Sequence, residues 1–355
     1  MSKIKPVKLS SARAWRTYLG GKLIDKLHGN EGASDTNFPE EWLMSTVRAR
    51  NVGREHIVEG ISLTQDGITL KEFIDGDPVG VLGKEHYQKY GNQTGVLVKL
   101  LDSMERLTVQ VHPTKDTAKK LFDSQFGKTE CWHILECRED IGEKPCIYLG
   151  FKEGITREKW QVCFDNQDIS GMLDCLHRVE VKPGETYLIC GGVPHAIGAG
   201  CMLVEIQEPT DYTVRTERVT PSGLKIDDFM CHQGLGFEKM FDCFNYEGLS
   251  YQEVLKRWQI IPIEKLTDEY VETEVVGYRD TQMFALKVID IKDKYSIKSN
   301  GTFSGIYVLS GKGIMDGVAI NQGDQFFLPA NVSDFDIVNT GDMPIKVIRF
   351  FGPQI

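Results

Sequence analysis

Short runs of hydrophobic residues, separated by polar or glycine-rich turns, recur along most of the chain. Many runs are rich in β-branched or aromatic residues, which favours strands. We expect strands at 107–111, 131–135, 202–206, 283–291, 305–311, 324–330 and 344–352. Helical spacing is rarer and predicts helices at 114–123, 156–177 and 251–258. The pattern therefore predicts a mainly β protein, built as a sandwich or barrel with helical decoration.

Two stretches of the chain resemble each other, which favours a duplicated barrel. Residues 181–195 and 320–334 both carry a glycine, an acidic residue and an aromatic-aliphatic strand that leads into a turn. When the two stretches are aligned, His195 lies opposite Asp334. Since no histidine follows His232, a histidine-based metal site cannot be built from the second copy alone.

Composition and charge narrow the class of protein. The 355 residues are 41% hydrophobic and carry a net charge of -10, which argues against non-specific binding to nucleic acid or anionic membranes. The first residues lack the apolar core of a secretion signal, and no stretch is apolar enough for a membrane helix. Nine cysteines without a paired framework predict reduced thiols. We therefore expect a cytoplasmic protein.

Three polar side chains fall on one face of the first predicted strand and its continuation. Alternation along a strand places Thr108, Gln110 and His112 together, opposite the apolar residues between them. Burying such a face is costly unless its polar groups are satisfied. A metal or a polar ligand inside a barrel would satisfy them.

The same alternation applies to the strand around residue 130. Lys128 and Glu130 share a face, whereas His133 lies on the other face and is read as a structural or surface residue. A lysine beside a metal-binding carboxylate could meet a substrate phosphate or hydroxyl. The alternative is an ordinary exposed lysine near a turn.

A glycine-rich turn precedes His195 and aims it rigidly, which suits a metal ligand. Two histidines, one glutamate and one amide oxygen form a mixed nitrogen and oxygen site. Zn²⁺ is its natural occupant, with Fe²⁺ or Mn²⁺ as substitutes.

Further charged residues alternate along the segment after residue 201. Glu205 and Gln207 share one face, and Thr213, Arg215 and Glu217 share another. An arginine inside a small barrel would bind anionic oxygens or a developing enediolate. Taken singly, each of these charges is more often part of a solvated strand face.

The order of these motifs resembles that of type I mannose-6-phosphate isomerases of the cupin superfamily, in their compact bacterial form. The motifs are PEEW at 39–42, QVHP at 110–113, GKTE at 127–130, VPHAIGAG at 193–200 and EIQ at 205–207 before Arg215. The resemblance covers nearly the whole chain. It implies two cupin (jelly-roll) β-barrels: a catalytic domain at 1–265 and a degenerate domain without a metal site at 266–355.

The resemblance also implies roles for individual residues. It implies one Zn²⁺ per chain, held by Gln110, His112, Glu130 and His195. Lys128 would contact the substrate, Arg215 would be catalytically important, and Glu205 would be an acidic residue of the pocket. Thr108 matches a substrate-binding position that is Ser or Thr in relatives.

One departure from the family pattern concerns the phosphate of the substrate. Eukaryotic relatives have a lysine six residues after the arginine, where this chain has Pro221. Arg218 or Lys225 could replace that lysine. Phosphate recognition is therefore less well supported than metal binding.

The implied reaction interconverts mannose 6-phosphate and fructose 6-phosphate through a cis-enediol. The sequence leaves the base open among Glu205, a zinc-bound water and a histidine. Three alternatives to this reaction remain: an isomerase or epimerase of another sugar or phosphosugar, a non-catalytic sugar-sensing cupin, and an Fe²⁺ dioxygenase. The expected partner is a small sugar phosphate. We expect the protein to bind neither nucleic acid nor a membrane, and to be a monomer or a homodimer.

Overall fold

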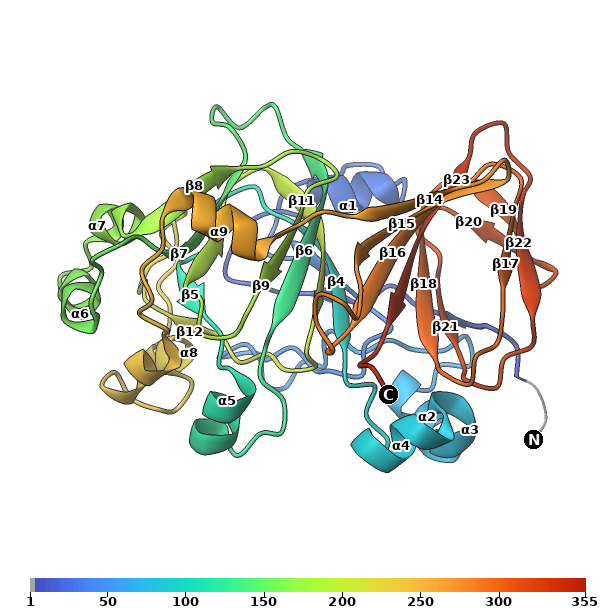
Figure 1. Cartoon of the computed structure of the whole chain (residues 1–355), viewed down its shortest axis with the longest axis horizontal. Helices are drawn as coiled ribbons and strands as arrows, with labels where there is room; N and C mark the ends of the chain where they lie inside the picture. Colours follow the sequence, from blue (N-terminus) through green and yellow to red (C-terminus); the bar gives the residue numbers. More distant parts are fainter. Residues whose placement is uncertain (1–3) are drawn as a thin grey trace.

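The structure, a computed structural model, describes residues 4–355. Figure 1 shows two β-sandwiches side by side, the first mainly green and the second orange to red, with short helices around them. The chain is therefore mainly β, as the hydrophobic pattern predicts. In the described residues each sandwich consists of two separate sheets, so neither forms a single closed ring of hydrogen-bonded strands.

The N-terminal sandwich is built from strands β2 to β13. Its large sheet has the order β13 (Gln259–Ile260), β9 (Thr186–Ile189), β6 (Glu130–Cys137), β11 (Cys201–Gln207), β4 (Leu97–Asp102), β3 (Glu40–Leu43) and β2 (Arg13–Ala14). Its small sheet has the order β12 (Val214–Arg215), β5 (Gln110–Val111), β10 (His195–Ile197), β7 (Cys146–Phe151) and β8 (Leu176–Glu180). Apolar side chains from both sheets, including Ile134 and Ile147, form a core between them.

The C-terminal sandwich is built from β1 and from strands β14 to β23. Its large sheet has the order β1 (Val7–Leu9), β21 (Gln325–Leu328), β18 (Ser304–Ser310), β23 (Ile345–Phe351), β16 (Ala285–Ile291), β15 (Tyr270–Val276) and β14 (Ile263–Leu266). Its small sheet has the order β17 (Lys294–Ile297), β22 (Phe335–Asn339), β19 (Lys312–Met315) and β20 (Val318–Asn321). A separate apolar core fills the space between these sheets.

The two large sheets also pack against each other through their outer faces. Val98 and Val204 of the N-terminal sandwich join Leu286 and Ile348 of the C-terminal sandwich in one buried cluster. Alternation explains this arrangement, because β11 buries Met202, Val204 and Ile206 on this face and turns the residues between them inward. The central strands of each large sheet are therefore buried on both faces, whereas β14, at the edge of the C-terminal sheet, is exposed.

Short helices fill the connections between strands. They are α1 (Lys22–Leu27), α2 (Leu70–Gly76), α3 (Pro78–Leu82), α4 (Lys84–Tyr90), α5 (Lys115–Phe122), α6 (Arg157–Asp165), α7 (Ile169–Asp174), α8 (Asp228–His232), the 3₁₀ helix η1 (Lys239–Cys243) and α9 (Tyr251–Trp258). Helices α2 and α9 begin with complete capping boxes at Thr69 and Ser250. Across residues 4–355, no helix has the length and apolar character needed to cross a membrane.

Most of the predicted elements are confirmed, and two are wrong in extent. The single helix predicted at 156–177 is two helices, because Gln167 adopts a left-handed φ of 49° and Asp168 then caps α7. The strand predicted at 107–111 contributes only its last two residues, β5, to the sheet. The other predicted strands correspond to β6, β11, β16, β18, β21 and β23.

The first strand of the chain pairs with the C-terminal sandwich. Val7 lies opposite Phe327, and β1 thereby forms one edge of the C-terminal large sheet. The chain then enters the N-terminal sandwich at β2. The predicted division at 1–265 and 266–355 stays a prediction.

Candidate active site

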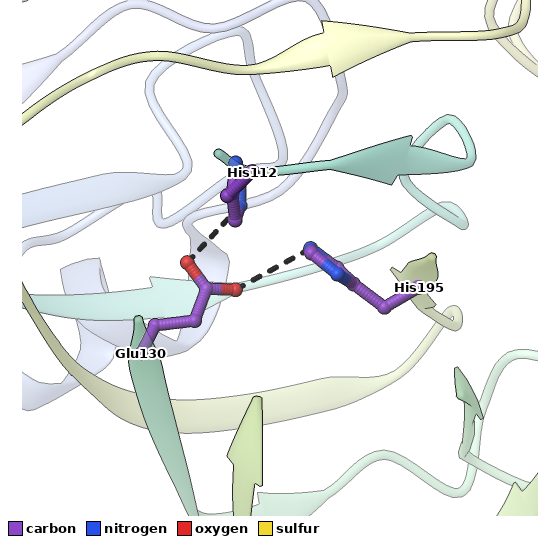
Figure 2. Close-up of side chains that lie close together, drawn as sticks. All are labelled: His112, Glu130 and His195. Carbon is purple, nitrogen blue, oxygen red and sulfur yellow. Dashed lines mark ion pairs between the residues drawn. The ribbon is translucent and has the colours of Figure 1, made fainter. Parts of the chain in front are cut away.

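The interior of the N-terminal sandwich brings three buried ligating side chains together (Figure 2). His112 follows β5, Glu130 begins β6 and His195 begins β10. His112 Nε2 lies 3.1 Å from Glu130 Oε2, and His195 Nε2 lies 3.4 Å from Glu130 Oε1. Among the residues that the structure describes, these form the one group of at least three His, Cys, Asp or Glu side chains placed to share a metal ion.

Gln110 completes the predicted set of four. It lies directly opposite His195 in the pairing of β5 with β10, and its Nε2 is 3.3 Å from His195 Nε2. Turning the amide by 180° presents Oε1 at the same point, as a metal ligand requires. The structure therefore brings together all four side chains that the sequence singles out.

Backbone hydrogen bonds fix the orientation of both imidazoles. His112 Nδ1 lies 2.8 Å from the carbonyl oxygen of Tyr212, and His195 Nδ1 lies 2.9 Å from that of Val193. With Nδ1 donating, each Nε2 keeps a lone pair and points toward Glu130. Burial, with the charge of Lys128, lowers the pKa of His112 to about 4, and burial also lowers the pKa of His195. Both rings are therefore neutral and able to bind a metal.

The Glu130 carboxylate is fully buried, and neither oxygen has a hydrogen bond of good geometry. Burial alone would raise its pKa, but the charge of Lys128 and the neighbouring His112 hold the pKa well below its usual range. Lys128 Nζ lies 3.2 Å from Glu130 Oε2 and 2.9 Å from His112 Nε2. Lys128 thus pairs with one oxygen of this buried anion, and the other oxygen, Oε1, faces His195 Nε2.

The donor set fits a divalent metal. Two neutral imidazole nitrogens, one carboxylate and one amide oxygen are the mixture that Zn²⁺, Fe²⁺ and Mn²⁺ accept. The oxygens of Glu130, which lack hydrogen bonds, and the Nε2 atoms of the two histidines, which face them, are the observations that support this fit.

A row of buried polar side chains crosses the inner face of the large sheet beside this site. Lys99 of β4 lies opposite Glu205 of β11, and its Nζ donates to Glu205 Oε1 at 2.8 Å. Trp132 of β6 lies on the other side of Glu205 and donates its Nε1 to Oε2 at 3.2 Å. Burial opposes the charge on Lys99, but Glu205 and Glu40 raise its pKa, so this buried lysine stays protonated.

Arg16 joins two further buried acids to this row. Its Nε donates to Glu40 Oε2 at 2.9 Å, and its two terminal nitrogens bond to Asp211 at 3.1 and 3.0 Å. Burial would raise the pKa of Asp211, but the charges of Arg16 and Lys99 hold it below its usual range. The result is a continuous network of paired charges next to the metal-ligand cluster.

A narrow cavity of about 40 Å³ opens among these groups. Its walls include the network residues Lys99 and Glu205 and three further residues that the sequence predicts for the site, Thr108, Lys128 and Arg215. Arg215 lies opposite Gln110 in the pairing of β12 with β5, and its Nη1 donates to two backbone carbonyl oxygens. Burial lowers the pKa of Arg215. Every predicted catalytic and substrate-binding residue therefore borders one cavity.

A larger cavity of about 940 Å³ adjoins the narrow one, because Asp211 borders both. Phe229, Met230 and Gln233, on and just after α8, line the larger cavity. The segment around α8 therefore shapes a hollow next to the charged interior.

The structure separates other residues from the site. His133 Nδ1 pairs with Thr186 Oγ1 at 2.9 Å, on the face away from Glu130, as alternation predicts. Pro221 lines a different cavity, and Arg218 stacks over the ring of Phe237 at 4.3 Å.

Comparisons with known proteins match both sandwiches to one family. The model of the phosphomannose isomerase type I catalytic domain matches residues 40–128, and that of the mannose-6-phosphate isomerase cupin domain matches residues 275–348. The chain belongs to the type I phosphomannose isomerase family. The matched segments include β3, β4, β5 and Lys128 in the N-terminal sandwich and most of the C-terminal sandwich.

Relatives in this family match most of the chain. The probable mannose-6-phosphate isomerase GmuF of Bacillus subtilis is 29% identical over 283 residues, which cover 76% of this chain and 82% of GmuF. The mannose-6-phosphate isomerase of Streptococcus mutans is 25% identical over 337 residues, which cover 92% of each chain. The members of this family are mannose-6-phosphate isomerases, and the chain is therefore assigned to this class of enzyme.

Solved structures show the same fold. Mannose 6-phosphate isomerase from Bacillus subtilis superposes with a TM-score of 0.74 at 22% identity, covering 98% of this chain and 99% of that one. A variant of phosphomannose isomerase from Salmonella typhimurium gives 0.70 at 14% identity, covering 98% and 100%. The cupin-type fold predicted from the sequence is therefore confirmed.

Sequence reasoning missed three residues of this candidate site. Arg16, Lys99 and Asp211 border the narrow cavity, but none of them lies in a motif used for the prediction. Lys99 had a signal, because it is the one charged residue inside the apolar run at 95–101. A lone charge in a strand that is buried on both faces needs a buried partner.

Proposed function

We propose that this chain is a Zn²⁺-dependent aldose–ketose isomerase that interconverts mannose 6-phosphate and fructose 6-phosphate through a cis-enediol. The observation that carries the proposal is the buried cluster of His112, Glu130 and His195, in which neither oxygen of Glu130 has a hydrogen-bond partner. It adjoins a cavity lined by both cationic and acidic side chains, Lys128 and Arg215 among the cations. The relatives named as mannose-6-phosphate isomerases support this substrate.

The four side chains Gln110, His112, Glu130 and His195 would hold the metal. Bound Zn²⁺ supplies positive charge that stabilises negative charge on substrate oxygens. The carbonyl oxygens of Tyr212 and Val193 keep both imidazoles in the tautomer that binds.

We assign the remaining charge stabilisation to Lys128 and Arg215. Both border the narrow cavity, as does Thr108, whose hydroxyl can bond to a sugar oxygen. Arg215 uses Nη1 for the carbonyl oxygens of Thr213 and Met230, which orients its planar guanidinium. Fixed positive groups of this kind stabilise an enediolate as its charge develops.

We propose Glu205 as the group that moves the proton between C2 and C1. Its carboxylate borders the cavity and is held by Lys99 and Trp132, so it is aimed before substrate binds. Exchanging Glu205 for Gln keeps its shape and removes its basicity. We expect turnover to fall by about 10²–10⁴-fold, with little change in metal content.

One set of assays tests the function. The protein is assayed with mannose 6-phosphate and with free mannose, before and after chelation and then after Zn²⁺ is restored. We expect isomerisation of the phosphosugar, loss with chelator and recovery with Zn²⁺. Turnover of mannose alone would overturn the substrate, and full activity in chelator would overturn the metal.

The variant Arg215→Ala tests the charge assignment. We expect turnover to fall by about 10²–10³-fold while bound Zn²⁺ is retained, because one charge stabiliser is lost. Near-normal turnover in this variant would remove Arg215 from the mechanism. Arg178→Ala is the matched control, since Arg178 is an exposed arginine on β8.

A further inference from the structure

Glu208 is a buried carboxylate that the proposed mechanism does not use. It is 1% exposed and follows the last residue of β11. Its Oε1 accepts the backbone N–H of Gly127 at 3.3 Å, and its Oε2 accepts that of Thr129 at 3.0 Å. One side chain therefore binds the amides on both sides of Lys128.

The same short segment also binds the carbonyl groups that flank Lys128. The backbone N–H of Glu208 donates to the carbonyl oxygen of Thr129 at 3.1 Å. The hydroxyl of Thr210 donates to the carbonyl oxygen of Gly127 at 2.7 Å. Residues 208–210 thus hold the peptide groups of both residues next to Lys128, although 79 or more residues separate the two segments in sequence.

Residues on either side of this segment connect it to the charged network. Gln207 Nε2 donates to the carbonyl oxygens of Glu208 and Thr210, at 3.0 and 2.6 Å, and so fixes the turn. Asp211 follows directly and pairs with Arg16. The turn therefore ties the backbone around Lys128 to the wall of the narrow cavity.

We propose that Glu208 is a positioning residue that sets the place of the Lys128 ammonium group relative to Glu130 and the cavity. The proposal rests on the function proposed above for Lys128. A carboxylate accepts amide hydrogen bonds that are stronger than those between neutral groups. Because it holds the amides on both sides of Lys128, Glu208 limits where Lys128 Cα can lie.

The other partner of Glu208 does not account for its burial. Lys115 Nζ lies 3.6 Å from Oε1, and the Lys115 side chain is 39% exposed. A partly solvated pair at this distance is weak. The amides of Gly127 and Thr129 are therefore the principal partners of the carboxylate.

The test is the variant Glu208→Gln. The amide side chain can accept from only one of the two backbone N–H groups and presents a donor to the other. We expect kcat/KM for mannose 6-phosphate to fall by roughly 10–100-fold, the effect of a small misplacement of a catalytic group. We expect bound Zn²⁺ to stay unchanged. The matched control is Glu185→Gln, because Glu185 also accepts a backbone amide, that of Lys182, and has no contact with the Lys128 segment.

A double-mutant cycle separates positioning from general stabilisation. If Glu208 acts through Lys128, Glu208→Gln added to Lys128→Ala lowers kcat/KM by less than about 2-fold further, because the two effects share one cause. If Glu208 only stabilises the fold, the two losses multiply. Multiplied losses, or loss of Zn²⁺ in the Glu208→Gln variant, would overturn the proposal.

Amide hydrogen exchange gives a readout that needs no substrate. We expect faster exchange at residues 127–129 in Glu208→Gln and, to a smaller extent, in Thr210→Val, with exchange in β6 unchanged. Unchanged exchange at 127–129 would contradict the positioning role. If the wild-type protein fails to isomerise mannose 6-phosphate, the proposed function fails alone, since the exchange result stands independently. Thr210→Val also serves if Glu208→Gln does not fold.

Discussion

The interior of the N-terminal sandwich contains paired charges, whereas the interior of the C-terminal sandwich is apolar. In the first, Lys99 pairs with Glu205 and Arg16 pairs with Glu40 and Asp211. In the second, residues such as Ile289, Ile306, Val308, Phe326 and Val347 fill the space between the sheets. The two halves share an architecture but differ in what they bury.

The difference assigns separate physical roles to the two halves. Apolar burial stabilises a fold in proportion to the area removed from water. Buried ion pairs contribute little net stability, because desolvation offsets their attraction. The C-terminal sandwich therefore contributes packing, and the charges of the N-terminal sandwich are best explained by the chemistry proposed there.

The two aligned turns show the same contrast. His195 is fully buried inside the N-terminal sandwich, whereas Asp334 is exposed and forms an ion pair with Lys298 at 3.3 Å. In the structure described for residues 4–355, the one candidate metal cluster lies in the N-terminal sandwich. The second copy has the strands but no histidine at this position.

The sharpest way to break the comparison is to remove the buried carboxylate of the metal-ligand cluster in the N-terminal sandwich. We expect Glu130→Ala to lose bound Zn²⁺ and at least about 10³-fold of isomerase activity, since metal and charge stabilisation go together. Metal analysis and the coupled assay measure the two effects. Glu136→Ala, on the exposed end of the same strand, is the control and keeps both.

A second change makes the N-terminal interior resemble the C-terminal one. Lys99→Met alone leaves Glu205 buried without its cation and should cost about 3–5 kcal/mol of unfolding free energy. Adding Glu205→Leu should recover most of that loss, while activity stays absent. Urea unfolding and the isomerase assay compare the single and double variants. A double variant that is both stable and active would show that this pair is dispensable for catalysis.

A third change removes an apolar side chain from the interior of the C-terminal sandwich. Ile306 is fully buried there, and Ile306→Ala should lower the free energy of unfolding by about 2–5 kcal/mol through lost contacts and a cavity. Bound Zn²⁺ and kcat of the folded protein should not change. Chemical denaturation and assays at low temperature check both. A selective fall in kcat would mean that the C-terminal core acts on the site.

The smallest expected effect concerns acid stability. Burial would raise the pKa of Glu40, but Arg16, Lys99 and the Trp42 indole N–H lower it to about 2. A depressed carboxyl pKa adds stability above the ordinary value of 4.5, and that stability is lost as pH falls toward 2. The contribution is at most about 3 kcal/mol.

The free energy of unfolding, measured from pH 6 to pH 2, tests whether the stability contributed by Glu40 falls as the pH falls. Wild type should lose stability more steeply below pH 4.5 than Glu40→Gln, which cannot titrate. Parallel curves for the two proteins would contradict the assignment. Glu272→Gln in the C-terminal sandwich is a useful comparison, because the pKa of that half-buried carboxyl is also lowered.

Much of the fold could be predicted from periodicity. Alternation along β11 separates Val204, which faces the second sandwich, from Glu205, which faces the cavity. Helix extent was harder to predict, because the break at Gln167 depends on a left-handed backbone conformation that no periodic pattern records.

The sequence by itself determined the candidate ligands and their faces. Strand alternation placed Gln110 beside His112 and separated Glu130 from His133, and the family resemblance then made Gln110, His112, Glu130 and His195 a ligand set. The absence of histidine after His232 also restricted a histidine-based metal site to the first copy. These conclusions needed no knowledge of distant contacts.

Only the tertiary structure decided which distant residues complete the site. Arg16 reaches Asp211 across 195 positions, and Glu208 reaches the amide of Gly127 across 81. Such pairs depend on the packing of the two sheets and on which strands are neighbours. The local pattern of residues carries no information on the packing or on the strand order. The ligands are therefore readable from the chain, while the charge network and the support of Lys128 depend on the fold.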